Sequence, residues 1–225
     1  MIKLVAFDWN GTLLADTLPS IQAENSLMKE LGVNKKITLR EYQNYFCIPI
    51  NEYFKALGFS EKFFAQNSTT IFNGFYKYYE PLEKKCRTRG GTKQILAWLN
   101  KSQVAAVIYS NHFSDHIKKQ TARLKISGHF AEILGRPLND DSHMRSRGKI
   151  ALLKNCIKKR GLRKEEVITL GDTEEEIDIG KSLGIITVAI TGGYNSETRL
   201  KKRHPDFLIH NMLELKKIVK KLNYK

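Results

Sequence analysis

Residues 2–12 read IKLVAFDWNGT, and this stretch decides how the rest of the chain is interpreted. Residues 2–7 form a short, mostly apolar run, which is typical of a strand buried on both faces of a parallel sheet. The run stops at Asp8, and Asn10-Gly11 is a turn signal because both residues tolerate a positive φ. Open α/β sheets bind ligands at the carboxyl ends of their strands, where turn N–H groups can receive an anion. Asp8 is therefore a candidate site residue, although a strand that simply ends in a turn would have the same sequence pattern.

The composition is that of an ordinary globular protein. The 225 residues are 41% hydrophobic and 27% charged, enough for one large domain or a core with a small insert. No apolar run approaches the ~20 residues of a membrane span, and the first residues show no signal-peptide pattern. The three cysteines are widely spaced without a Cys-x-x-Cys motif, so we expect neither a disulfide framework nor a zinc knuckle. We expect a cytoplasmic protein without a membrane partner.

The formal net charge is +15, from 38 basic and 23 acidic residues. Such a charge is found in nucleic-acid-binding proteins. Here, however, the lysines and arginines are spread along the chain, and we find no RNA-binding sheet motif and no zinc finger. We therefore favour a solvated surface that attracts small anionic substrates over dedicated nucleic-acid binding.

Residues 16–87 are predicted to form an all-helical insert. Thr38 and Glu41 match a capping box, Ser60 is a candidate N-cap, and Pro81 is expected to end the last helix. The segment is rich in aromatic residues, which at these spacings are more typical of a helical core than of a binding site. The four helices expected from spacing and caps cover residues 20–31, 38–46, 50–57 and 60–79.

After residue 88 the pattern alternates between apolar, β-rich runs and amphipathic helices. This alternation predicts a parallel α/β sheet with right-handed crossovers. Residues 137–147 are polar and are expected to form a loop. The predicted strands cover residues 104–109, 130–134, 167–170, 185–190 and 206–209, and the predicted helices cover 92–100, 114–124, 148–160, 174–183, 196–202 and a segment from 213 onward.

Four polar residues follow predicted strands or begin the next helix: Asp8, Ser110, Lys149 and Asp172. Because such strand ends share one edge of a sheet, these distant residues can converge. Two nearby carboxylates favour a cation between them, and oxygen ligands suit Mg²⁺. A lysine and a hydroxyl group could hold phosphate oxygens, and the combined charges would stabilise a phosphoryl group in transfer.

Each of these residues also has a simpler interpretation. Ser110 could be a turn residue, Lys149 could lie on a solvated helix face, and residues 171–173 could only cap a helix. His112 and His116 are four residues apart on an expected helix and could share a metal. For this histidine pair we favour an ordinary polar face.

Two motifs in the first half of the chain resemble those of the haloacid dehalogenase-like (HAD) phosphohydrolase superfamily. Asp8-x-Asn10-Gly11-Thr12 is similar to the first motif, usually DxDGT. Residues 107–111, VIYSN, resemble the second, an apolar strand that ends in Ser or Thr. The expected helical insert lies between them, where this family carries its small helical cap.

Two further motifs continue the resemblance. Lys149, 23 residues before Asp172, is similar in spacing to the third-motif lysine, with Arg147 as a competing candidate. Residues 171–176, GDTEEE, resemble the fourth motif, GDxxxD, with Glu176 in place of the last acid. The tail, at residues 190–194 and 206–207, is similar to that of phosphoglycolate phosphatase-like members.

The resemblance implies a fold, a reaction and residue roles. The fold is a Rossmann-like parallel α/β core, residues 1–15 and 88–225, with an inserted helical cap, residues 16–87. The reaction is Mg²⁺-dependent hydrolysis of a small phosphomonoester through an aspartyl-phosphate. The implied catalytic residues are Asp8, which is the nucleophile, Asn10 and Lys149. The implied substrate-binding residues are Gly11, Thr12, Ser110, Asn111 and Lys149. The implied metal ligands are Asp8, the Asn10 carbonyl, Asp172 and Glu176, although Glu176 could support Lys149 instead of the metal.

Asn10 departs from the family pattern, which has an aspartate there as the general acid/base. An amide cannot exchange a proton in this way, and such help is worth about 10²–10⁴-fold in rate. The enzyme could be slow or restricted to good leaving groups, such as acyl or aryl phosphates. Alternatively, His112 or a cap side chain could replace the missing acid. The third alternative is a protein that binds a phosphorylated ligand without turning it over.

Overall fold

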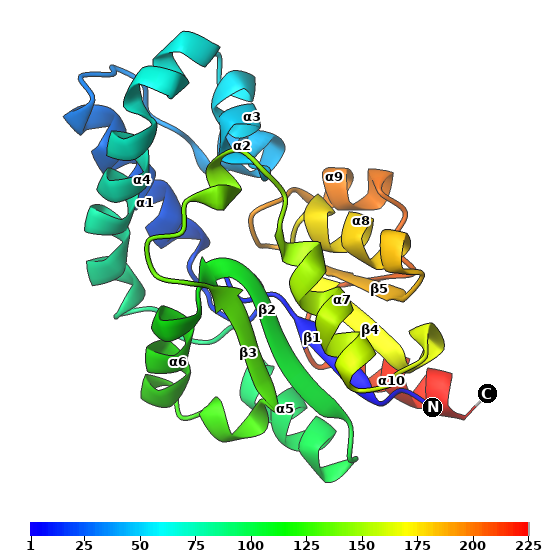
Figure 1. Ribbon diagram of the computed structural model, residues 1–225. Coiled ribbons are helices and arrows are strands. Elements are labelled where there is room, and N and C mark those ends of the chain that lie inside the picture. The colour runs from blue at the N-terminus through cyan, green and yellow to red at the C-terminus, as the bar shows by residue number, and fades with distance from the viewer. Residues whose placement is uncertain (225) are drawn as a thin grey trace.

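The computed structural model describes residues 1–224 and contains a six-stranded parallel sheet with helices on both faces (Figure 1). The strand order is β3-β2-β1-β4-β5-β6, so the chain runs outward from β1 first in one direction and then in the other. A sheet of this kind binds ligands where the direction reverses, at the carboxyl end of its central strands. The strands are β1 (Leu4–Phe7), β2 (Ala105–Phe113), β3 (Glu132–Arg136), β4 (Val167–Gly171), β5 (Ile186–Ile190) and β6 (Phe207–Ile209).

The central strand β1 is buried on both faces, as its apolar run predicts. Leu4 and Ala6 pack in one cluster with α7 and α8, whereas Val5 and Phe7 pack in another with α5, α6 and α10. Side chains alternate between the faces of a strand, so a strand between two helical layers must be apolar at every position. The helices of this α/β core are α5 (Thr92–Lys101), α6 (Ser114–Arg123), α7 (Lys149–Lys159), α8 (Glu174–Leu183), α9 (Glu197–Lys202) and α10 (Glu214–Asn223).

Between β1 and α5 the chain forms four helices, which Figure 1 shows as a layer beyond one end of the sheet. The capping box of Thr38 and Glu41 is present, and the Ser60 hydroxyl accepts a hydrogen bond from the Phe63 N–H group. The aromatic residues of these helices form their own hydrophobic cluster, which also contacts Phe113 and Tyr194 of the α/β core. These helices are α1 (Thr17–Glu30), α2 (Leu39–Tyr45), α3 (Ile50–Ala56) and α4 (Glu61–Glu83).

The α/β class and the helical insert are therefore confirmed, whereas the exact limits of the two domains stay a prediction. The expectation that Pro81 ends the fourth helix is wrong, because α4 continues to Glu83 with the proline inside its last turn. Proline lacks an N–H group and costs the helix one hydrogen bond. Here the last turn is held by Glu83, whose buried carboxylate bonds to His112 of the neighbouring strand.

The second predicted strand is also longer than expected. It continues through Ser110 and Asn111 to Phe113, with an irregularity in its pairing to β3 after Tyr109. His112 therefore lies in a strand and not on a helix with His116. The predicted loop at residues 137–147 contains one short 3₁₀ turn, Ser142–Met144. Within residues 1–224, no helix combines the length and the apolar character that a membrane crossing requires.

Candidate active site

The structure brings together the four polar residues that the sequence placed at strand ends. Lys149, the first residue of α7, lies with its Nζ atom 2.5 Å from Oδ1 of Asp8. It also donates to Glu176, in the first turn of α8. Only 2% of Lys149 is exposed, so the interpretation of this residue as a solvated lysine is wrong. Asp8 and Lys149 form a buried ion pair at the centre of the sheet edge.

Asp172 directly follows β4 and is fully buried. Its Oδ1 atom accepts a hydrogen bond from the Thr12 hydroxyl, and its Oδ2 atom accepts one from the Tyr194 N–H group at 2.6 Å. Gly11 and Gly193 lie against the same carboxylate, since a Cβ atom on either would stand 2.2 or 2.1 Å from Oδ2. Gly11 also has a φ of 71°, which favours glycine. The glycine of the first motif is thus required by contact and conformation together.

Burial dominates the electrostatics of this acidic cluster. It raises the pKa of Asp8 well above its ordinary value, an effect that Lys149 opposes and that Glu176 and Asp172 reinforce. Burial and then Glu176 raise the pKa of Asp172 to about 7. Burial is thus the first cause of both pKa shifts, and the neighbouring carboxylates add to it.

Glu175 is a member of this cluster that sequence reasoning missed. It is 6% exposed, and its Oε2 atom accepts a hydrogen bond from the Asn111 amide at 2.7 Å, whereas Oε1 is buried without a partner. Burial raises its pKa to about 7. In the sequence, Glu175 stands between two other glutamates, and nothing local indicates which of them is buried.

The donor set fits a divalent cation. Four buried carboxylates lie in this cluster, those of Asp8, Asp172, Glu175 and Glu176. Lys149 pairs with Asp8 and Glu176, and Oε1 of Glu175 has no partner among the described residues. Hard oxygen ligands are those that Mg²⁺ prefers. Each Asp172 oxygen accepts one hydrogen bond and retains a further lone pair for a metal.

Glu176 has less freedom than the other acids. Its Oε1 atom binds Lys149, and its Oε2 atom accepts hydrogen bonds from the N–H and hydroxyl groups of Thr173, at 3.0 and 2.6 Å. These bonds complete a capping box at the start of α8. Of the two roles expected for Glu176, this geometry favours support of Lys149. A role as a metal ligand stays a prediction.

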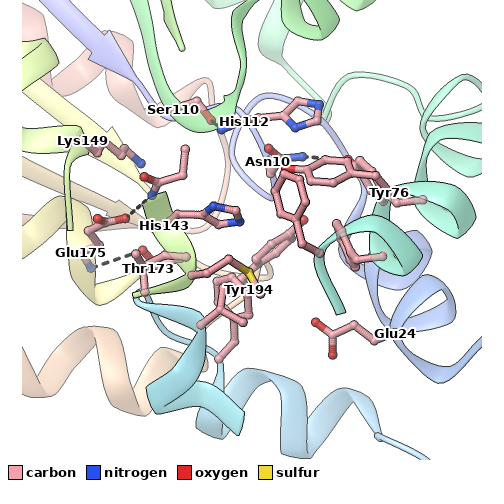
Figure 2. Close-up of a pocket in the computed structure, with 18 of the residues that line it drawn as sticks. Asn10, Glu24, Tyr76, Ser110, His112, His143, Lys149, Thr173, Glu175 and Tyr194 are labelled. Atoms are coloured by element: carbon pink, nitrogen blue, oxygen red, sulfur yellow. Dashed lines mark hydrogen bonds between the residues drawn. The ribbon is translucent and has the colours of Figure 1, made fainter. Parts of the chain in front are cut away.

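Ser110 and Asn111, the residues of the second motif, lie in the wall of the same cavity. Ser110 is 2% exposed, and its hydroxyl accepts a hydrogen bond from the His112 N–H group at 3.1 Å. Figure 2 shows Ser110, Lys149, Glu175 and Thr173 around one side of the cavity, with Tyr76 and Glu24 on the other. The competing cation Arg147 instead donates to the Ile48 carbonyl and faces Asp178, so the geometry favours Lys149.

Asn10 has partners that the sequence did not reveal. Its amide nitrogen donates to Oδ2 of Asp16 and to the Tyr79 hydroxyl, each at 2.7 Å. Asp16 is fully buried and also accepts hydrogen bonds from the Gly11 N–H group at 2.6 Å and the Tyr194 hydroxyl at 2.8 Å. Burial raises the pKa of Asp16, and these donors oppose the rise.

Asp16 was missed because its partners come from both domains and from distant parts of the sequence. In the sequence it only marked the start of the insert. In the structure it anchors the first-motif turn against α4 and the segment after β5. Position 10 therefore has no carboxylate of its own, but its amide contacts the carboxylate of Asp16, six residues later in the sequence.

His112 does not lie on an exposed polar face, so that prediction is wrong for this residue. It is 5% exposed, and its Nε2 atom lies 3.0 Å from Oε1 of Glu83. Glu83, His112 and His116 each place one ligand atom within 4.8 Å of the other two. Metal binding by the two histidines, the alternative raised by their spacing, stays open.

The doubly wound parallel sheet, its helical insert, and the buried Asp8, Lys149 and Asp172 at its carboxyl edge place the protein in the Rossmann-like α/β class. Residues 5–190 match the haloacid dehalogenase-like hydrolase family, and the chain belongs to that family. It is 24% identical to a phosphoglycolate phosphatase of Photobacterium profundum, over 97% of this chain and 96% of that protein. It is 25% identical to a phosphoglycolate phosphatase of Haemophilus influenzae, over 96% and 98%.

Solved structures have the same fold. A haloacid dehalogenase-like hydrolase of Streptococcus pneumoniae superimposes with a TM-score of 0.81 at 21% identity, covering 97% of this chain and 98% of that one. A hydrolase of Pseudomonas syringae superimposes with a TM-score of 0.76 at 16% identity, covering 98% and 99%. At these identities the likeness concerns the fold alone.

Proposed function

We propose that this protein hydrolyses a small phosphomonoester with Mg²⁺, through an aspartyl-phosphate on Asp8. The observation that carries the proposal is the buried contact of 2.5 Å between Asp8 Oδ1 and Lys149 Nζ, at the carboxyl edge of the sheet. The family assignment and the full-length relatives named phosphoglycolate phosphatase support a phosphatase.

In this proposal the Asp8 carboxylate attacks phosphorus, and the bond from phosphorus to the ester oxygen breaks. Lys149 and the Ser110 hydroxyl hold the phosphoryl oxygens, and Glu176 keeps the lysine in place. Mg²⁺, held by Asp8, Asp172 and the Asn10 carbonyl, would neutralise charge on the phosphoryl group. Water then attacks the aspartyl-phosphate, which releases inorganic phosphate and restores Asp8.

Asn10 contributes no proton to either step. Both hydrogens of its amide group are directed to Asp16 and Tyr79, so the amide serves to hold the first-motif turn and not to exchange a proton. This observation favours one second candidate, a protein of the same fold that binds a phosphorylated ligand and turns it over weakly or not at all.

Phosphate release from a panel of phosphomonoesters tests the proposal. We expect turnover with Mg²⁺, loss of turnover on adding EDTA, and no turnover by Asp8→Asn, which cannot form an acyl phosphate. Asp178→Asn, on the outer side of α8, is the matched control and should retain activity because its carboxylate only faces Arg147 and Arg203. If the wild type is as inactive as Asp8→Asn but binds inorganic phosphate with Mg²⁺, the protein is a binder and the enzymatic proposal is wrong.

A further inference from the structure

The cavity wall opposite Lys149 is apolar. It is built by the four inserted helices and the segments between them, and Figure 2 shows it across the cavity from the catalytic groups. Many of its side chains also belong to the hydrophobic cluster of the insert, so the wall is a continuation of a packed core. The residues that define it are Phe46, Ile50, Phe54, Ile71, Phe72 and Phe75.

The polar groups in this wall offer no positive charge near pH 7. Glu24 is 6% exposed, its Oε2 atom accepts a hydrogen bond from the Tyr53 hydroxyl at 2.7 Å, and burial raises its pKa to about 8. Burial lowers the pKa of His143 to about 3, so its imidazole is neutral. A group entering this part of the cavity therefore meets hydrocarbon, aromatic rings and neutral hydrogen-bonding atoms.

Lys149 is the one lysine or arginine that lines the cavity within residues 1–224, and it is already shared between Asp8 and Glu176. The buried guanidinium of Arg136 lies outside the lining, where it stacks on Phe113 and donates to the Asn111 carbonyl and the Tyr76 hydroxyl. His112 also lines the cavity, but its Nε2 atom already faces the buried carboxylate of Glu83 at 3.0 Å. A second anionic group against the apolar wall would thus be buried without a counter-charge of its own, which is strongly unfavourable.

We propose that the natural substrate is a phosphomonoester whose organic group is apolar, most favourably aromatic, and carries no second anionic group. This inference rests on the proposed phosphatase function and excludes phosphoglycolate, whose carboxylate would face the wall of the insert. Aromatic rings in the wall can pack against an aromatic leaving group edge-on or offset.

The chemistry at Asn10 points to the same substrates. When Asp8 attacks phosphorus, the electron pair of the breaking P–O bond goes to the ester oxygen. An alkoxide needs a proton at that moment, and Asn10 has none to give. The Nε2 atom of His112, the alternative acid, faces Glu83. A phenolate is stable enough to leave as an anion and to take its proton afterwards from water. Water then cleaves the aspartyl-phosphate, so that the products are a phenol and inorganic phosphate.

A pair of matched esters tests the inference. Phenyl phosphate and 4-carboxyphenyl phosphate have the same aryl–oxygen bond, and the carboxylate makes the second phenol a slightly better leaving group. We expect kcat/KM to be at least about tenfold lower for 4-carboxyphenyl phosphate, because an unpaired buried charge outweighs the leaving-group advantage. We expect 2-phosphoglycolate to be a poorer substrate than either.

A charge placed in the wall should reverse this preference. Ile50 is half-buried at the start of α3, and Ile50→Lys should raise kcat/KM for 4-carboxyphenyl phosphate relative to phenyl phosphate. Ile50→Met, of similar length without charge, should leave the ratio of the two esters unchanged.

Binding of two phosphonates, which this route cannot hydrolyse, separates the possible failures. With Mg²⁺, we expect benzylphosphonate to bind the wild type at least about tenfold more tightly than 4-carboxybenzylphosphonate. Equal binding, together with equal turnover of the two esters, would overturn the substrate class but leave a phosphatase. If no ester is hydrolysed while the phosphonates bind as expected, the apolar wall favours ligands without a second anionic group, as inferred. Only the catalytic proposal then fails. If neither phosphonate binds and no ester is hydrolysed, both proposals fail.

Discussion

Asn10 and Asp16 together contain one carboxyl group, and the amide of Asn10 donates a hydrogen bond to Oδ2 of Asp16 at 2.7 Å. A carboxylate at position 10 would place a half-buried acid in contact with the buried Asp16. Because like charges at this distance cannot both ionise, one of them would have to stay protonated. The residue type at position 10 is thus coupled to that at position 16. Asn10, which departs from the family motif, and Asp16 form an amide–carboxylate pair.

We expect Asn10→Asp alone to lower the melting temperature, by an amount that grows from pH 5 to pH 8. Repulsion raises the shared pKa of the pair above that of unfolded aspartate, so the folded state holds an extra proton and loses stability as pH rises. The double variant Asn10→Asp/Asp16→Asn restores one carboxylate and one amide. It should melt closer to the wild type and gain activity, up to the roughly 10²–10⁴-fold that a general acid supplies.

Calorimetry at the two pH values and kcat/KM for an alkyl phosphate measure these effects. Two results together would disprove the coupling. The difference in stability between Asn10→Asp and the wild type would be the same at pH 8 as at pH 5, and Asn10→Asp would be as active as the double variant.

Among the elements, α8 depends on how closely it lies on the sheet. Asp172 and Glu176 stand at its start, and Gly180 faces Thr169 and Thr187 of β4 and β5. A Cβ atom on Gly180 would lie 2.3 Å from Cγ2 of Thr187 and 2.7 Å from Cγ2 of Thr169. A glycine that would weaken an isolated helix is required here by the approach of two strands.

Gly180→Ala should therefore destabilise the protein by about 1–3 kcal/mol, as overpacking does, although alanine is the better helix former. Ser182→Ala, at an exposed position of the same helix, should be neutral or slightly stabilising. Chemical denaturation of both variants measures the difference. A stabilised Gly180→Ala variant would mean that α8 can move away from the sheet freely.

Contacts between the inserted helices contain a second pH-sensitive feature. Glu24 of α1 accepts its hydrogen bond from Tyr53 of α3, and burial raises its pKa from 4.5 to about 8. The folded state therefore binds one more proton than the unfolded state between these two values. Its contribution to stability is present below about pH 4.5 and is lost as pH rises toward 8.

Glu24→Gln keeps the acceptor for Tyr53 and removes the ionisation. We expect the variant to lose less stability than the wild type between pH 5 and pH 8, by a few kcal/mol at about 1.4 kcal/mol per pKa unit. Melting temperatures over this range measure the effect, and Glu30→Gln, an exposed acid of α1 paired with Lys77, is the control. Parallel curves for wild type and Glu24→Gln would show that Glu24 is ionised in the folded protein.

Across the whole molecule, the net charge of +15 should affect how substrate arrives. A positively charged protein raises the local concentration of anionic substrates, and salt screens this attraction over about 10 Å at 0.1 M. The cavity itself holds several acids, so the attraction comes from the surface and not from the site.

We expect kcat/KM for a phosphomonoester to fall as KCl rises from 50 to 500 mM, while kcat at saturating substrate changes little. The reason is that screening slows encounter without altering the bound complex. Steady-state kinetics at fixed Mg²⁺ measure both constants. A kcat/KM that is independent of salt would show that the surface charge has no part in substrate capture.

The order of the secondary structures could be predicted because it depends on local patterns. The apolar run before Asp8, the capping box at Thr38 and the alternation after residue 88 are each formed by residues close in sequence. The convergence of Asp8 and Lys149 could be predicted as well, because strand ends of a parallel sheet meet at one edge, whereas their direct contact could not. These features follow from the spacing of apolar residues along the chain and from the topology of a parallel sheet.

Other features were decided only by the tertiary structure. Asp16 accepts a hydrogen bond from Tyr194, 178 residues away, and Glu175 and Glu176 line the cavity whereas Glu174 pairs with Arg199 and Arg203. The burial of Glu24 and the extension of α4 past Pro81 likewise depend on what packs against them. Long-range contacts determine burial, charge balance and the loss of hydrogen bonds to water. Local sequence patterns therefore cannot predict these properties. Local patterns thus predict the fold and the candidate site residues, whereas long-range packing sets the charge of these residues and forms the apolar wall that they face.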